Sequence, residues 1–364
     1  MMKIPRIAFI DDGINPKYIP TGVPFENYVV INEEVYSAKP ERGFTHCTAC
    51  YRIFVEHLNQ VPYHLVSIKV LENTGFGMKS ATITALKWCS ENDIDIINMS
   101  MGTRQYDDFY SIAEVINRLS NKIIIAACNN NNSLTLPACL PTVIGVRCFK
   151  ENGYCEPLYC ISEPYDQIDI IVNANESIES NSMSVPVVTA FVCEAFSKGL
   201  HKLGEIKNEL TKNSKNNALT LTYGFYKSIL SQWESIKVPV VAIIDNSPDA
   251  ESKLKRLIKL YVEDGYNAVG LSFCINTDVQ GLIFKISEAL LKESVSKQAL
   301  IELYCNYALP DILFMHLNKT NEHYLCKEIE TDININLDDL NENSCGDIRY
   351  QINKLYNVIN EHLL

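Results

Sequence analysis

Residues 6–13 read RIAFIDDG, a short apolar run that ends at two aspartates and a glycine. This pattern is typical of a buried strand that stops at a turn. Similar apolar runs occur at 63–71, 94–99, 122–127, 142–147 and 168–172. Stretches with helical periodicity, at 79–91 and 108–119, lie between some of them. Strands that alternate with helices predict an α/β fold whose mostly parallel sheet is covered on both faces.

The second half of the chain repeats this alternation after a change in composition. A helix predicted at 182–198 precedes residues 201–218, which lose apolar residues and gain Lys and Asn. Beyond them we expect helices at 222–236, 250–263, 278–292 and from Ile348, and strands at 238–244, 267–272 and 311–317. The sequence therefore predicts a first domain at 1–200, a linker at 201–218 and a smaller α/β domain at 219–364. The alternative for 201–218 is a solvated helix inside one larger domain.

The composition of the 364 residues excludes several classes of protein. Hydrophobic residues make up 47% and charged residues 21%, which excludes a disordered or collagen-like chain. The net charge of −12 repels phosphate backbones, so nucleic acid is not an expected partner. The sequence has neither a run of 18 apolar residues nor a signal peptide, so no membrane association is expected. Among the 13 cysteines only Cys47 and Cys50 have the Cys-x-x-Cys spacing, and they lack a second pair. We therefore expect reduced thiols in a cytoplasmic protein with no metal and no cofactor.

Side chains suited to hydrolytic chemistry stand at the ends of these predicted elements. Asp11 follows the first strand, where a carboxylate can orient an imidazole, and His46 precedes a helical pattern. Residues 98–102 (NMSMG) and 126–129 (AACN) each end a strand, where an amide can donate to a developing oxyanion. Ser182 begins a helix, where a serine is usually a cap but can also be a nucleophile. Each motif alone has an ordinary explanation: a turn, a core histidine, a polar loop or a helix cap.

Taken together, in the order Asp, His, Asn, Ser, these segments resemble the subtilisin-like serine peptidases, or subtilases. The family patterns are D-[ST]-G, H-G-T-x-[VC], N-M-S-x-G, A-x-G-N and G-T-S-M-A-x-P, and the resemblance covers about residues 4–200. It implies a subtilisin-like three-layer fold that hydrolyses a peptide bond. The implied catalytic residues are Asp11, His46 and Ser182, with Asn129 in the oxyanion hole. The residues implied to bind substrate as an added strand are Ser100, Met101 and Gly102.

The register at the histidine has two solutions. The segment 43–47 (GFTHC) also aligns with the family's H-G-T-H-V, which would place Gly43 at the catalytic position. In that register Arg52 would face the core. With His46 at the catalytic position, residues 50, 53, 54 and 57 form one mostly apolar stripe, so we prefer His46.

Departures from the family patterns bear on the activity. Cys47, Cys128 and the pair Ser180-Asn181 stand where the family has glycine or Gly-Thr, and Asp12 stands where it has a hydroxyl. A replaced glycine removes backbone freedom near a catalytic group. These changes are compatible with a slow or specialised enzyme, or with a catalytically impaired pseudo-protease that binds a peptide or partner as a scaffold.

The compact spacing of the site residues indicates shortened surface loops. We expect no pro-region like that of secreted subtilases before Ile7, and we expect narrow substrate recognition in its place. The chain resembles proteases that cut a leader from a ribosomally made precursor peptide, so such a peptide is the expected partner. Residues 245–253 (DNSPDAESK) match a phosphate loop poorly, so the second domain is interpreted as a degenerate P-loop-like module for peptide or partner binding. The oligomeric state stays open.

Overall fold

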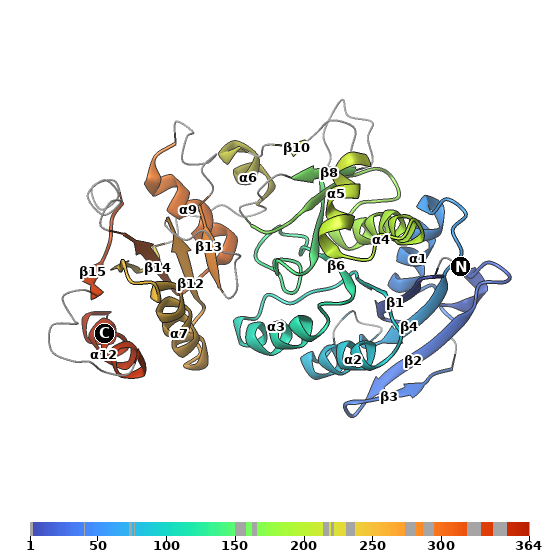
Figure 1. Cartoon of the computed structure of the whole chain (residues 1–364), viewed down its shortest axis with the longest axis horizontal. Coiled ribbons are helices and arrows are strands. Elements are labelled where there is room, and N and C mark those ends of the chain that lie inside the picture. The colour runs from blue at the N-terminus through green and yellow to red at the C-terminus, as the bar shows by residue number, and fades with distance from the viewer. Residues whose placement is uncertain are drawn as a thin grey trace. The chain divides into compact units, whose positions relative to one another are not determined.

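A computed structural model describes most of the chain as two compact units. The described residues are 3–39, 41–72, 75, 77–149, 158–161, 166–213, 218–219, 222–230, 237–273, 282–286, 295–318, 329–337 and 348–363. Unit 1 is Met1–Arg104 with Asp108–Thr220, and unit 2 is Gln105–Asp107 with Leu221–Leu364. Figure 1 labels their elements. Within the described residues, no helix combines the length and the apolar character that crossing a bilayer requires.

Unit 1 is built on a ten-stranded sheet with the order β10-β8-β9-β7-β6-β5-β1-β4-β2-β3. Its strands pair in parallel, except for the antiparallel pairs β2–β3 and β8–β9. The predicted α/β fold with a mostly parallel sheet is confirmed. The strands are β1 (Arg6–Asp11), β2 (Phe25–Ile31), β3 (Glu34–Ser37), β4 (His64–Lys69), β5 (Ile96–Met99), β6 (Ile123–Ala127), β7 (Ile144–Phe149), β8 (Leu158–Ile161), β9 (Ile170–Asn173) and β10 (Ala218–Leu219).

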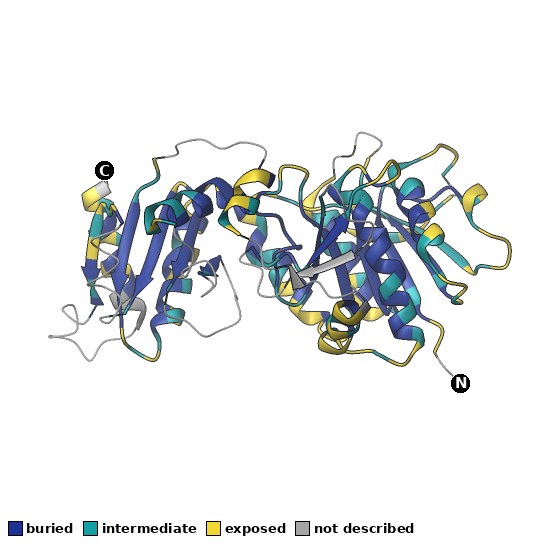
Figure 2. Cartoon of the chain, turned by 90° about the horizontal axis from the view of Figure 1, so that it is seen from above, coloured by how far each residue is buried: buried dark blue, intermediate teal, exposed yellow. Residues whose placement is uncertain are grey.

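Helices cover both faces of this sheet. Helices α1 (His46–His57) and α4 (Asn181–Ser197) pack together on one face, whereas α2 (Lys79–Glu91) and α3 (Phe109–Arg118) pack on the other (Figure 1). Figure 2 shows that most of the sheet between these helices is buried. Unit 1 therefore has three layers.

The packing of β1, α1 and α4 fixes the edge of the sheet that matters for function. Phe9 of β1 makes edge-to-face contacts with Tyr51 and Phe54 of α1, at centroid distances of 5.9 and 5.7 Å. Helix α4 is buried along most of its length, as expected for a helix with apolar residues on all sides. Both helices therefore begin at fixed positions relative to the carboxyl end of β1.

The segment predicted as a linker differs in the structure. Residues Leu203–Asn213 form helix α5, and Ile206 and Leu210 are fully buried in the hydrophobic core of unit 1. Within this helix, Lys207, Asn208 and Lys212 lie on faces that are not buried, as expected for an amphipathic helix. The boundary between the two units falls after Thr220 instead.

Unit 2 has a five-stranded sheet of parallel strands in the order β13-β12-β14-β11-β15. Helix α7 packs against β12 and β14, and α12 packs against α7. The smaller C-terminal α/β unit predicted from the sequence is thus present. Its elements are α6 (Tyr223–Ile229), β11 (Val240–Ile244), α7 (Ala250–Glu263), β12 (Ala268–Ser272), β13 (Ile283–Lys285), α9 (Lys297–Ala308), β14 (Ile312–Leu317), β15 (Ile333–Asn336) and α12 (Ile348–Leu363).

One predicted helix is wrong in its described part. The helix expected at 278–292 contains strand β13, which pairs with β12, while residues 278–281 and 287–292 lie outside the described residues. Pairing with a neighbouring strand overrides the local periodicity here. The helix expected at 222–236 is present as α6, and residues 231–236 also lie outside the described part.

Candidate active site

The candidate site lies at the carboxyl end of β1, where the chain continues to β4 on one side of β1 and to β5 on the other. A crevice therefore forms at the carboxyl ends of these strands. Asp11 is the last residue of β1, Ser100 follows β5, and Asn129 follows β6 two residues after its last residue. The carboxyl ends of parallel strands meet at one edge, which explains why residues far apart in sequence gather here.

His46 lies between an acid and a serine. Its Nδ1 is 2.9 Å from Asp11 Oδ2, and its Nε2 is 3.0 Å from Ser182 Oγ. An ionised carboxylate only accepts, so Nδ1 carries the proton and Nε2 is left to accept the Ser182 hydroxyl proton. The structure thus brings together the three residues expected to be catalytic. His46, rather than Gly43, is the residue in contact with both groups.

The amino end of α1 is held by Asp12, a role that the sequence analysis missed. Asp12 Oδ2 accepts from the His46 N–H at 3.1 Å, and its Oδ1 accepts from the Cys47 N–H at 2.8 Å. Thr45 caps the helix by accepting from the Thr48 N–H at 3.0 Å. Asp12 therefore satisfies two amides that a helix start leaves without intrahelical partners, and it fixes the backbone of His46.

The amino end of α4 presents Ser182 in its first turn. Ser180 is the N-cap, and its hydroxyl lies 3.4 Å from the Met183 N–H and 3.0 Å from Ser182 Oγ. Ser180 has an extended backbone (φ −144°, ψ 160°), and Cys47 lies within α1. Neither they nor Cys128 are among the described residues with positive φ, so these replaced glycines cause no backbone strain.

Asn129 lies at the site, but its amide is directed into its own loop. Its Nδ2 donates to Ser133 Oγ and to Thr135 Oγ1, both at 2.7 Å. The next residue, Asn130, accepts from the Asn181 N–H at 3.2 Å, beside Ser182. The residue expected to donate to an oxyanion is therefore held in a different orientation, and Asn130 is a second amide at the same edge.

A hollow of about 310 Å³ connects these groups. It is lined by Asp11, Asp12, His46, Leu71, Gly75, Ser100, Met101, Gly102, Ala127, Cys128, Asn129, Asn130 and Ser182. The segment expected to bind substrate, 100–102, is thus one of its walls. A Cβ atom on Gly102 would lie 2.6 Å from the Leu136 carbonyl oxygen, so glycine is required for this close approach.

Comparison with known families identifies the chain. The model of the subtilase family matches residues 61–242, which is half of the chain and includes Asn129 and Ser182. This chain belongs to the subtilase family. The match begins after Asp11 and His46, so the structure alone relates these two residues to the rest of the site.

A curated relative and two solved structures are similar to this subtilase. Subtilisin DY from Bacillus licheniformis is 25% identical over 175 residues, which cover 44% of this chain and 64% of the relative, less than two thirds of its length. A cold-adapted subtilisin-like serine proteinase has a TM-score of 0.42 at 17% identity, covering 59% of this chain and 85% of that one. A lanthipeptide protease has a TM-score of 0.41 at 12% identity, covering 56% and 78%.

Burial and charge determine the protonation of this subtilase's site. Asp11 is 1% exposed, and burial raises its pKa, an effect opposed by the hydrogen bonds from His46 and the Asp12 N–H. The hydrogen bond to Asp11 raises the pKa of His46, and the neighbouring Cys50 adds to that rise. The raised pKa means that the surroundings of His46 favour the imidazolium, the form that appears when the histidine accepts a proton.

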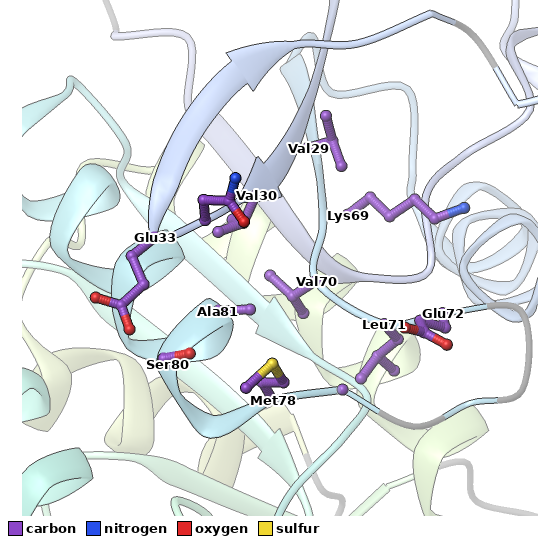
Figure 3. A pocket seen from close by; sticks show the side chains of 12 residues that line it. Val29, Val30, Glu33, Lys69, Val70, Leu71, Glu72, Met78, Ser80 and Ala81 are labelled. Atoms are coloured by element: carbon purple, nitrogen blue, oxygen red, sulfur yellow. The ribbon is translucent and has the colours of Figure 1, made fainter.

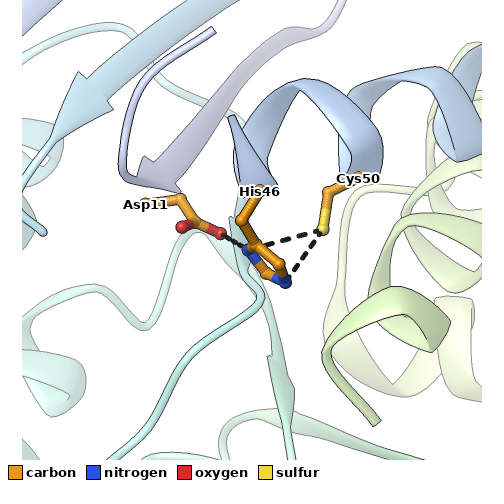
Figure 4. Close-up of side chains that lie close together, drawn as sticks. All are labelled: Asp11, His46 and Cys50. Atoms are coloured by element: carbon orange, nitrogen blue, oxygen red, sulfur yellow. Dashed lines mark hydrogen bonds and ion pairs between the residues drawn. The ribbon is translucent and has the colours of Figure 1, made fainter. Parts of the chain in front are cut away.

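Cys50 is a neighbour of His46 that the sequence analysis did not single out. Its Sγ lies 3.8 Å from His46 Nε2 (Figure 4). The same Sγ lies 3.8 Å from the Ser182 carbonyl oxygen. Ligand atoms of Asp11, His46 and Cys50 all lie within 4.8 Å of one another, so they form a donor set that could hold a metal ion. Such an ion would compete with Asp11 or Ser182 for a nitrogen of the His46 imidazole. The i, i+4 spacing of His46 and Cys50 on a predicted helix was the available signal.

Proposed function

We propose that this chain is a serine endopeptidase with Ser182 as nucleophile, His46 as general base and Asp11 as the residue that orients His46. The observation that carries the proposal is the position of the His46 imidazole, 2.9 Å from Asp11 and 3.0 Å from Ser182. A merely structural histidine needs one hydrogen-bond partner. A nucleophile in contact with a base, which is in turn in contact with an orienting acid, is the arrangement that acyl transfer requires.

The first chemical step forms an acyl-enzyme. Ser182 Oγ attacks the carbonyl carbon of the scissile bond while its proton moves to His46 Nε2. The buried Asp11 carboxylate stabilises the resulting imidazolium through Nδ1–H. The tetrahedral intermediate then expels the amine, which takes the proton from His46. Water repeats the sequence on the ester, releases the acid product and restores Ser182.

Two further groups support this reaction. The Ser182 N–H lies in the first turn of α4, where the helix dipole favours negative charge, and it would donate to the oxyanion together with a side-chain amide. Asn129 supplies that amide if it leaves Ser133 and Thr135 when substrate arrives. The segment 100–102 would pair with an extended substrate as an added strand.

The proposal extends to the substrate class, a ribosomally made precursor peptide from which a leader is removed. This part rests on the resemblance described in the sequence analysis. We also propose unit 1, which contains Asp11, His46 and Ser182, as the peptidase part.

Labelling with a fluorophosphonate tests the activated serine without knowledge of the substrate. Wild type is expected to gain one adduct by intact mass, and peptide mapping should place it on Ser182. Ser182→Ala and His46→Ala should gain none, whereas the matched variant Ser180→Ala, which changes the neighbouring serine, should still be labelled. An unlabelled wild type would contradict the proposal.

A second candidate function is a catalytically impaired protein that binds a peptide as a scaffold. The observation that favours it is the Asn129 amide, which donates inside its own loop rather than into the hollow. This function predicts that the wild type binds peptides but gains no fluorophosphonate adduct, and that peptide turnover is the same in wild type and Ser182→Ala.

A further inference from the structure

A second hollow, of about 730 Å³, lies beside the candidate active site and exceeds it in size. Its walls come from the β2–β3 hairpin, the end of β4 with the residues after it, and the start of α2 (Figure 3). Leu71 lines both hollows, so the larger one adjoins the candidate cleft at this residue. The residues that line it are Val29, Val30, Asn32, Glu33, Lys69, Val70, Leu71, Glu72, Gly77, Met78, Ser80 and Ala81.

Met78 is in a position that stability alone does not explain. It is 74% exposed, and it is the N-cap residue of α2 without a side-chain hydrogen bond. Ser, Thr, Asp and Asn are preferred at this position because they accept from the first amides of the helix. The protein thus has a flexible apolar side chain at the mouth of the hollow in place of a helix cap. An exposed methionine is the type of surface that adapts to a peptide.

Glu33 is also in an unfavourable position for its residue type. Asn32 and Glu33 form the tip of the β2–β3 hairpin, with φ of 51° and 62°. Asn is tolerated in this left-handed region, whereas glycine is the usual second residue of such a turn. Figure 3 shows Glu33 and Glu72 on opposite sides of the apolar floor.

The charge of the hollow favours a basic occupant. Glu33 and Glu72 are exposed at its rim. The one lining cation among the described residues, Lys69, lies 2.8 Å from a Glu41 oxygen, which balances its charge. A bound segment with apolar side chains would cover Val29, Val30 and Met78, and its Lys or Arg side chains would meet the two carboxylates.

We propose that this hollow binds a recognition segment of the peptide substrate, composed of apolar residues and Lys or Arg, outside the residues held at the cleft. The proposal rests on the proposed function for the identity of the occupant as a substrate. It assigns selection of the peptide to the β2–β3 hairpin and the start of α2, and chemistry to the cleft.

Peptide binding to a catalytically disabled protein tests the hollow separately from the reaction. A random displayed peptide library is selected on Ser182→Ala, and the enriched peptides are synthesised and their affinities measured. Enrichment of apolar residues with Lys or Arg is expected. Adding Glu33→Lys and Glu72→Lys should weaken binding about ten-fold. The matched double change Glu91→Lys and Glu361→Lys, in the last turns of α2 and α12, should alter it less than two-fold.

Met78→Ser distinguishes a binding role from a structural one. Serine should improve the cap of α2 and raise the melting temperature by about 2 °C, while peptide binding falls about five-fold. No enriched peptide, equal binding after the charge reversal, or a stabilised Met78→Ser with unchanged binding would each overturn the proposal. If wild type gains a fluorophosphonate adduct but gives any of these results, the binding role of the hollow is wrong and the proposed peptidase activity stands. If peptide binding depends on the two glutamates but wild type gains no adduct, the proposed peptidase activity is wrong and the hollow still binds peptides.

Discussion

The candidate site has a histidine side, formed by Asp11, Asp12 and His46, and an amide side, formed by Asn129. Only on the histidine side do the side chains already have the contacts that the proposed reaction needs. On the histidine side, Asp11 orients the imidazole and Asp12 fixes the backbone of His46, so the nucleophile and its base are in contact. On the amide side, Asn129 donates to Ser133 and Thr135 within its own loop. The comparison indicates that the serine and its proposed base are already in contact in the fold, whereas Asn129 would have to change partners before it could donate to an oxyanion.

Loss of the histidine side should have the largest effect. His46→Ala removes the base that takes the serine proton, and kcat/KM should fall by about 10⁶-fold. The matched variant is His57→Ala on the same helix, whose Nδ1 contacts only the Ile53 carbonyl oxygen in the described interactions. It should stay within about two-fold of wild type. The measurement is cleavage of a peptide selected from a library, and equal losses in both variants would indicate a folding defect.

The amide side is tested by comparing Asn129→Ala with Asn130→Ala. Replacing the residue that donates to the oxyanion should lower kcat by about 10²- to 10³-fold with little change in KM. If Asn129 changes partners on binding, its variant should show this loss and Asn130→Ala should not. The opposite ranking would assign the role to Asn130, and two small effects would leave the Ser182 N–H as the main donor.

Asp12 should have an intermediate effect as a positioning residue. Asp12→Ala removes the acceptor of the His46 and Cys47 N–H groups, so kcat should fall about ten-fold and stability by about 1 kcal/mol. Asp12→Asn keeps one acceptor oxygen and should recover part of both losses. Kinetics and thermal unfolding of the two variants measure this. Full activity with reduced stability would show that the capping is structural only.

The pH dependence should show the smallest difference. Asp11 raises the pKa of His46, so His46 stays protonated, and unable to accept a proton, up to a pH above its ordinary value of 6.5. Activity should therefore be lost on acidification through a limb above 6.5, and Asp11→Asn should move that limb downward in the kcat/KM profile. For stability the sign is opposite. The raised pKa of His46 adds its full contribution to the free energy of unfolding below pH 6.5, and this contribution is lost as the pH rises through the folded-state pKa.

The fold could be predicted because it follows from local patterns, whereas the proposed site residues came from the resemblance of short motifs to the subtilases. The stripe of residues 50, 53 and 54 on α1 is buried and Arg52 is exposed, as the preferred register requires. The partly exposed strands β2 and β3 were missed because their apolar runs, 28–31 and 35–36, are short. The orientation of Asn129 could not be predicted, since its partners Ser133 and Thr135 compete with the cleft for the same amide.

By itself, the sequence determined the alternation of strands and helices, the order of Asp11, His46, Asn129 and Ser182, and the placement of each at the end of an element. Periodicity and residue type are local properties, so one chain is sufficient to read them. The tertiary structure alone decided that His46 and Ser182, 136 residues apart, are in contact and that a second hollow adjoins their cleft. Such contacts depend on how the strands are ordered in the sheet and on the direction of each side chain, which local patterns do not specify.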